Sequence, residues 1–190
     1  MKILITGSSK GLGKSLFNKL ENIESTNKEI YNLNSDKGIN KIINKIKNNN
    51  YDVFINNAHA HFAQTKLLSS VFNLWKDQNK TIVNIISRAA YPNISKGFMY
   101  ASSKASLSFL SNSLKFNTNK KCKIIDINPG LLNSKLPSLS NDEMADIIIW
   151  CLNQPKHIEI GEISAWHSAP YVDVQKQKQI LLNESRKNLG

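Results

Sequence analysis

The stretch of the chain that decides its fold runs from residue 6 to residue 15 and reads Thr6-Gly7-Ser8-Ser9-Lys10-Gly11-Leu12-Gly13-Lys14-Ser15. It follows an apolar run at residues 2–6, and leucines recur at positions 12, 16 and 20, on one face of a helix. Glycines allow a backbone to approach a phosphate closely, and the N-terminus of a helix offers unpaired N–H groups to an anion. The stretch therefore predicts a strand, a nucleotide-binding turn and a helix at the start of the chain.

Two kinds of nucleotide-binding turn compete for this stretch. A P-loop has four residues between its first glycine and Gly-Lys-Ser/Thr, whereas five residues separate Gly7 from Gly13 here. A P-loop protein also needs an aspartate at the end of a later apolar strand to hold magnesium. Only Asp126 offers one, and Ile127 continues that strand beyond it. The pattern Thr-Gly-x-x-x-Gly-x-Gly, in contrast, fits residues 6–13 without a gap.

Apolar runs alternate with amphipathic helical patterns along the rest of the chain. We expect six strands, at residues 2–6, 29–33, 52–56, 81–87, 123–127 and 159–165. We expect helices at residues 11–21, 38–47, 62–76, 100–116 and 141–152. Because the strands are apolar throughout, both faces of their sheet must be covered, which is typical of a parallel sheet. Residues 1–168 are predicted to form one domain, and residues 169–190 a polar tail with a helix over 174–183.

The composition narrows the classes of partner. The 190 residues carry a net charge of +11, yet 23 of the 25 basic residues are lysines. Arginine, which contacts phosphates and bases through paired hydrogen bonds, is scarce and the lysines are scattered, so we expect no nucleic-acid partner. No apolar run reaches the roughly 18 residues that cross a bilayer, so we expect no membrane partner. Cys122 and Cys151 lie in apolar surroundings, which favours reduced core residues and a cytoplasmic location.

A second set of residues follows the later strands in a fixed order. Tyr100 and Lys104 lie four residues apart, on one face of an expected helix. Ser87 ends the strand that precedes them. Asn57-Ala58 follows an earlier strand, and Asn128-Pro129-Gly130 follows a later one. The Tyr–Lys spacing alone arises easily by chance in a lysine-rich chain, whereas the joint order of all these residues is far more specific.

In this order and spacing the residues resemble the short-chain dehydrogenase/reductase family over roughly residues 1–165. The resemblance implies an α/β fold of the Rossmann type, a doubly wound parallel sheet of about six strands with helices on both faces. It also implies an NAD(P)-dependent oxidoreductase that transfers a hydride between the cofactor and a small carbonyl or alcohol. The residues that would be catalytic are Ser87, Tyr100 and Lys104. Those that would bind the cofactor are Gly7, Ser9, Lys10, Gly11, Leu12, Gly13, Asn34, Asn57, Ala58, Tyr100, Lys104, Pro129, Gly130, Leu132 and Ser134.

The residue types suit that chemistry. Hydride transfer to a ketone places negative charge on its oxygen, so a positioned acid must deliver a proton. A free tyrosine is a poor acid–base group near neutral pH, and the ammonium group of Lys104 would favour the phenolate form of Tyr100. Lys104 could also hold the nicotinamide ribose, while the Ser87 hydroxyl would orient the substrate oxygen.

Two positions depart from the family pattern. Its members commonly carry a catalytic asparagine in the helix before the serine strand, but counting back from Ser87 reaches the neighbourhood of His61, and Asn73 lies about three turns too far along. His59 stands where the family motif has a glycine beside the cofactor. These departures keep a catalytically inert, nucleotide-binding regulatory protein open as an alternative. His59 and His61 have no further clustered ligand, so we expect no metal.

The spacing of the elements leads to two further expectations. Only eighteen residues, 34–51, separate the second and third strands, which leaves room for one helix. We therefore expect no additional strand there, with the strand at residues 29–33 at one edge of the sheet. The helices at residues 62–76 and 100–116 carry more apolar residues than one sheet face needs. Family members commonly pair through the equivalent helices, so we expect a homodimer or a higher homo-oligomer.

The end of the second strand bears on the choice of cofactor. An NAD-specific site usually carries an acid there, which binds the ribose 2′-hydroxyl and repels a 2′-phosphate. Residues 31–35, including Asn34, end the expected strand without a charge, and Asp36 comes too late. Lys10 occupies a position where NADP-preferring family members often carry a basic residue. The resemblance therefore implies that NADP(H) is preferred over NAD(H).

Overall fold

In this computed structural model, the alternation of apolar runs and amphipathic helical patterns gives an α/β fold. The structure describes residues 1–91, 97–117, 119–169, 176, 179, 180 and 183. The strands are β1 (Ile3–Thr6), β2 (Ile23–Thr26), β3 (Val53–Asn56), β4 (Thr81–Ile85), β5 (Lys123–Pro129) and β6 (Glu162–Ala165). The helices are α1 (Gly11–Lys19), α2 (Asp36–Asn48), α3 (Ala63–Trp75), α4 (Phe98–Lys115) and α5 (Asn141–Leu152), with a short 3-10 helix, η1 (Arg88–Ala90), after β4.

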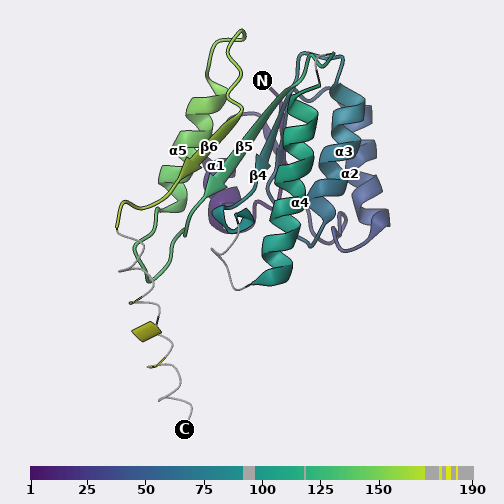
Figure 1. Cartoon of the computed structure of the whole chain (residues 1–190). Coiled ribbons are helices and arrows are strands. Elements are labelled where there is room, and N and C mark those ends of the chain that lie inside the picture. The colour runs from purple at the N-terminus through teal and green to yellow at the C-terminus, as the bar shows by residue number, and fades with distance from the viewer. Residues whose placement is uncertain (92–96, 118, 170–175, 177–178, 181–182, 184–190) are drawn as a thin grey trace.

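The strands form one parallel sheet in the order β2-β1-β3-β4-β5-β6 (Figure 1). The predicted doubly wound parallel sheet of six strands is confirmed. Residues 34–51 hold α2 and no strand, as predicted. The chain turns outward from β1 to β2 and then crosses back to β3, so the strand order reverses between β1 and β3. In open parallel sheets, ligand crevices lie outside the carboxyl ends of the strands at such a reversal.

The position of the second strand was predicted wrongly. Residues 29–33 form turns and bends, and the edge strand is β2, which pairs with β1 from Ile3–Ile23 to Thr6–Thr26. An edge strand has one neighbour and is only partly buried, so β2 needs little apolar character and contains a single aliphatic residue. Tyr31 and Leu33, which made residues 29–33 look like a strand, pack instead against the core beneath α2 and α3.

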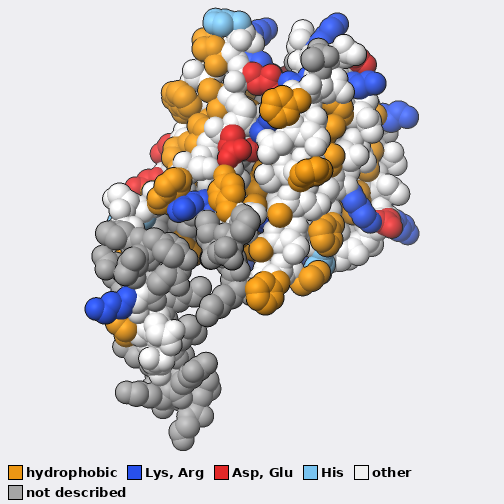
Figure 2. Space-filling view, viewed as in Figure 1, with side chains coloured by type: hydrophobic (Ala, Val, Ile, Leu, Met, Phe, Trp, Pro, Cys, Tyr) orange, Lys and Arg blue, Asp and Glu red, His pale blue; other side chains and the backbone are white. Residues whose placement is uncertain are grey.

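Helices cover both faces of the sheet, with α2, α3 and α4 on one face and α1 and α5 on the other (Figure 1). The apolar side chains of α3 pack into the core on the face of the sheet that α2, α3 and α4 cover, and the large ones that are buried there are Leu67, Leu68, Val71, Phe72 and Trp75. Helix α4 differs, because it keeps large apolar side chains at the surface (Figure 2). The excess apolar character predicted for two helices therefore belongs to α4 alone.

A buried polar network joins the three central strands. The Asn56 side chain of β3 donates to the Asn84 side chain of β4, and Asn84 donates to a carboxylate oxygen of Asp126 on β5. Ser111 of α4 donates to the same oxygen, and the Lys115 amine lies 2.6 Å from the other. Burial raises the pKa of the Asp126 carboxyl, an effect that Lys115 opposes. Because each polar group needs its partner, the network fixes how β3, β4, β5 and α4 align.

The last two strands differ in their bounds from the sequence prediction. Strand β5 extends to Pro129, and β6 begins at Glu162, later than expected. Of the helix expected over residues 174–183, only residues 176, 179, 180 and 183 are described, all of them helical, and the rest lies outside the described residues. Cys122 and Cys151 are buried free thiols. Within the described ranges, no helix has the length and apolar character that crossing a membrane requires.

Candidate active site

The glycine turn is held by close backbone packing that excludes larger residues. Gly7 has a φ of 75°, and a Cβ atom there would lie 2.7 Å from the Cβ of Ala58. A Cβ on Gly13 would collide with the carbonyl of Gly7, so α1 begins tightly against the turn. The Asn57 side chain donates to the carbonyls of Thr6 and Gly7, at 3.0 and 2.8 Å. Lys10, at the N-terminal cap of α1, makes no side-chain capping hydrogen bond. The turn therefore leaves the first N–H groups of α1 available to an anion.

Two adjoining cavities open along the carboxyl ends of the strands. The first, which we call the turn cavity, has a volume of about 840 Å³ and is lined by the glycine turn and by the residues that follow β2. The second, the Tyr100 cavity, has a volume of about 780 Å³ and extends from β4 and β5 to α4. Asn57 and His59 line both, so the two cavities share a wall. Together they form one elongated site across the centre of the sheet.

The structure brings most of the sequence-predicted site residues to these cavities. Those that line the turn cavity are Gly7, Ser9, Lys10, Asn34, Asn57 and Ala58. Those that line the Tyr100 cavity are Leu12, Asn57, Ser87, Tyr100, Lys104, Pro129, Gly130, Leu132 and Ser134. Gly11 and Gly13 line neither cavity and serve the geometry of the turn. Asn34 reaches the wall from a loop, whereas the sequence analysis had placed it at the end of a strand.

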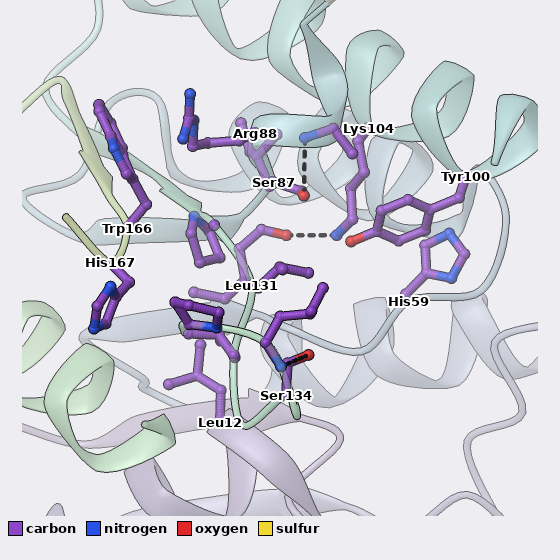
Figure 3. A pocket seen from close by; sticks show the side chains of 18 of the residues that line it. Leu12, His59, Ser87, Arg88, Tyr100, Lys104, Leu131, Ser134, Trp166 and His167 are labelled. Carbon is purple, nitrogen blue, oxygen red and sulfur yellow. Dashed lines mark hydrogen bonds between the residues drawn. The ribbon is translucent and has the colours of Figure 1, made fainter. Parts of the chain in front are cut away.

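Ser87, Tyr100 and Lys104 come to one cavity from two elements (Figure 3). Ser87 follows β4, and its Oγ accepts a hydrogen bond from the Ala89 N–H at 3.1 Å, so its own O–H remains able to donate. Tyr100 lies in the first turn of α4 with 38% of its surface exposed, and Lys104 lies one turn later with 3% exposed. The Lys104 amine is 5.7 Å from the centre of the Tyr100 ring.

The Lys104 amine is buried and bonded to neutral groups. It donates to the Ile85 carbonyl at 2.6 Å and to the Gln64 side-chain oxygen at 2.7 Å. Burial lowers the pKa of Lys104 from 10.5 to about 7. A lysine with such a pKa can lose or take up a proton as the pH passes through neutrality, whereas a fully hydrated lysine stays protonated there.

Gln64 is a site residue that the sequence analysis missed. It lies in the first turn of α3 with 2% of its surface exposed, and its side-chain N–H₂ donates to the carbonyls of Asn56 and Ile85. Its side chain thus orients Lys104. Gln64 belongs to α3, the helix in which the family pattern places a catalytic asparagine. Asn73, the other candidate, is exposed and lines neither cavity. A single glutamine in a helix gives no sequence signal, because its partners are distant in the chain.

His59 replaces the expected glycine and contacts Tyr100 directly. Its ring centre lies 4.9 Å from that of Tyr100 in an edge-to-face arrangement, and its Nε2 lies 3.1 Å from the Ser103 hydroxyl. Burial, with a smaller contribution from the charge of Lys104, lowers the pKa of His59, which favours the neutral ring. The bulky side chain therefore supports the Tyr100 ring from the wall between the two cavities.

Arg88 and Trp166 form a second part of the cavity wall that the sequence analysis did not identify. The guanidinium carbon of Arg88 lies 3.9 Å from the centre of the Trp166 ring. Both side chains lie on the opposite side of Ser87 from Tyr100 (Figure 3). Trp166 follows β6 and lies far from Arg88 in the sequence, so only the fold brings the two side chains together.

Other readings of the sequence find less support in the geometry. Asp126, the candidate magnesium ligand of a P-loop, lies inside β5 and is bonded to Lys115, Ser111 and Asn84. Its oxygens are therefore occupied by protein partners. Among the described residues, no group of three or more His, Cys, Asp or Glu side chains is gathered in a way that could hold a metal ion.

The lowered pKa of Lys104 leads to a pH-dependent stability. The folded state holds the Lys104 proton less tightly than the unfolded state, so the contribution of this group to stability rises between about pH 7 and 10.5. We expect wild-type stability to rise relative to Lys104→Met by up to about 1.4 kcal/mol per pH unit in that window. Urea unfolding at about pH 6, 8 and 10 measures the difference. The difference in stability between wild type and Lys66→Met, at an exposed lysine, should not change with pH. A difference between wild type and Lys104→Met that is also independent of pH would contradict the lowered pKa of Lys104.

Comparison with known proteins agrees with this architecture. Residues 38–145 match the family model described as short chain dehydrogenase. The structure is similar to that of an alcohol dehydrogenase from Thermococcus sibiricus, with a TM-score of 0.72 and 14% identity, over 90% of this chain and 98% of that one. It is also similar to the 3-alpha-hydroxysteroid dehydrogenase of Pseudomonas sp. B-0831, with a TM-score of 0.72 and 14% identity, over 86% and 94% of the two chains.

A third similar structure is the serine dehydrogenase of Escherichia coli, with a TM-score of 0.67 and 15% identity, over 90% of this chain and 99% of that one. No curated protein sequence matches the chain. The structural similarities, at these low identities, speak for the fold, whereas the family model covers more than half of the residues. The glycine turn, the parallel sheet and the family match lead to one conclusion: this chain belongs to the short-chain dehydrogenase/reductase family.

Proposed function

We propose that the protein transfers a hydride between NADP(H) and a small carbonyl or alcohol substrate, with Ser87, Tyr100 and Lys104 as its catalytic residues. One observation carries the proposal. These three side chains line a single cavity, and that cavity shares a wall with the one formed by the glycine turn. A dinucleotide needs two such neighbouring compartments, since its reactive ring and its adenosine lie on either side of a pyrophosphate.

The residues present fit a dinucleotide. The close packing at Gly7 and Gly13 keeps the turn tight, and Gly7 in the cavity wall together with the uncapped N-terminus of α1 suits a pyrophosphate. Pro129, Gly130, Leu132 and Ser134 would flank the nicotinamide, and Ala58 would line the adenosine side. The bound cofactor would supply the hydride chemistry, and the protein would supply orientation and proton transfer. Two of the similar structures, the Thermococcus and Pseudomonas enzymes, are complexed with 5-hydroxy-NADP and NADH, which supports a nicotinamide cofactor here.

Each catalytic side chain has a distinct part in this scheme. The Ser87 hydroxyl donates a hydrogen bond to the substrate oxygen and fixes its direction. The Tyr100 hydroxyl gives its proton to that oxygen during reduction and takes it back during oxidation. Lys104, which is buried and oriented by Gln64 and the Ile85 carbonyl, places its amine beside the Tyr100 ring.

Substitution of Tyr100 tests the catalytic assignment. Tyr100→Phe should lower kcat by at least about 100-fold, because the hydroxyl supplies the proton, and should leave cofactor affinity within about threefold. Lys104→Ala should damage both turnover and cofactor binding. Steady-state kinetics on a carbonyl substrate from a screen, with nucleotide titration, measures both quantities.

Tyr91→Phe is the matched control, since the Tyr91 hydroxyl bonds Glu162 and lies outside the cavity lining. Turnover that survives Tyr100→Phe would overturn the assignment. Nucleotide binding without reduction of any carbonyl in the screen would favour the inert regulatory alternative. The complete set of three catalytic residue types argues against that alternative, because binding alone does not need them.

Charges around the turn cavity support the preference for NADP(H). Lys10 lines this cavity as expected, and the corrected strand position adds Lys28, two residues after the end of β2. Glu29 is the acidic residue among the described lining residues, and it follows Lys28. Two ammonium groups against one carboxylate favour a ligand with an additional phosphate. All three side chains are exposed, so solvent and salt weaken the preference.

We expect NADP to bind more tightly than NAD by about 1–2 kcal/mol, which is roughly 5- to 30-fold. Calorimetric titration of both nucleotides should show a preference that falls with added salt and in Lys10→Ala and Lys28→Ala. Lys47→Ala, on α2 outside the lining, is the control. Equal affinities in the unmodified protein, or tighter binding of NAD, would rule out the preference.

The exposed face of α4 supports a homodimer. Phe98, Met99, Phe109 and Phe116 are between 66% and 84% exposed, and Figure 2 shows apolar side chains along this helix. Covering such a face would bury apolar area that is otherwise hydrated. Light scattering should give twice the chain mass, and Phe109→Ser should shift the protein toward monomer, whereas Phe17→Ser on α1 should not. A monomer at micromolar concentration would count against the assembly.

A further inference from the structure

We propose that the substrate is an oxo acid, a carbonyl compound whose carboxylate is bound by the Arg88 guanidinium. This inference rests on the proposed function, because it places the carbonyl at Ser87 and Tyr100. Arg88 immediately follows Ser87, at the start of η1, and both line the Tyr100 cavity. The cavity that would take the carbonyl is therefore also lined by a guanidinium that could bind a charged group of the same substrate.

The guanidinium is positioned but has no anionic partner in the described part of the chain. It stacks on Trp166, 3.9 Å from the ring centre, and no described carboxylate forms an ion pair with it. Stacking uses the face of the group and leaves its N–H edge free for two parallel hydrogen bonds. Glu162, the acid on neighbouring β6, is bonded to Tyr91 and Asn128 instead. The arrangement preorganises a cation for a planar anion.

The charge of the cavity points the same way. Arg88 and Lys104 are the Arg and Lys side chains among the described lining residues, and none of those residues is Asp or Glu. An anionic substrate would enter without repulsion from a carboxylate. The use of arginine is itself informative, since the chain has 23 lysines and only two arginines. A lysine ammonium binds a carboxylate as a point charge, whereas arginine fixes its orientation through two bonds.

The remaining walls restrict the carbon skeleton. Leu131, Leu136 and Pro137 line the cavity from the loop after β5, and Ile86 lines it from the segment after β4. These side chains offer no hydrogen bonds to a polar chain, so an apolar carbon skeleton suits this part of the wall. A short aliphatic oxo acid meets the three requirements of the cavity.

The first experiment compares matched substrates. Oxo acids of four to six carbons and their uncharged methyl esters are offered with NADPH, and the ratio of kcat/KM between acid and ester is measured. We expect a ratio above about tenfold, falling to about one in Arg88→Met, mainly through KM. Arg88→Lys should restore only part of the ratio. Lys135→Met removes an equal charge from a loop residue outside the cavity lining and should leave the ratio unchanged.

The second experiment measures binding without turnover. Trp166 is half-exposed in the cavity, so butanoate should change its fluorescence and butanamide should not; Trp150→Phe reduces the background, and Trp75 is buried. The butanoate signal should disappear in Arg88→Met. Butanoate binding through Arg88 without reduction of any carbonyl would support the anion site and contradict the proposed function. Equal kcat/KM for acids and esters, or butanoate binding that persists in Arg88→Met, would overturn the inference and leave the proposed function standing.

Discussion

The buried amine of Lys104 is the group on which the geometry of the site depends. It belongs to α4, and its two acceptors belong to the segment at the end of β4 and to α3, so one nitrogen atom joins three elements. An amine placed this deeply would be strongly destabilising without those bonds. The requirement extends to Gln64, whose side chain bonds two carbonyls and the amine together. A shift of α3, β4 or α4 would therefore break several buried hydrogen bonds at once.

The same constraint continues into the sheet. Asn56 bonds the backbone of Gln64 and the side chain of Asn84, and Asn84 bonds Asp126, so a line of polar groups crosses β3, β4 and β5. These bonds align the carboxyl ends of the central strands, from which Asn57, Ser87 and Pro129 reach the two cavities. A core of aliphatic side chains could pack in slightly different registers, whereas paired polar groups cannot slide without losing partners. The polar network thus gives the site its precision.

Charge is distributed according to depth. Most lysines lie on the surface, where water and salt screen them, and the large net charge by itself indicates no partner. Lys104 is buried without a carboxylate partner, and Arg88 is held against Trp166 on a cavity wall that the described acids do not share. Where water is excluded, charges are screened less, so a single cation there attracts a bound anion more strongly than an exposed cation does. The composition therefore says less about function than the placement of two cations does.

The amino-acid sequence determined the class of fold, the glycine turn and the residues expected at the carboxyl ends of β1, β3, β4 and β5. These features are local, since periodicity, glycines and strand-end residues can be read within one segment. The sequence did not locate β2, because an edge strand with one neighbour needs little apolar character. Only the tertiary structure assigned Gln64 to Lys104, His59 to Tyr100 and Trp166 to Arg88. The partners in these contacts come from different strands and helices, and no propensity or spacing encodes a contact that exists only once the sheet has brought the two segments together.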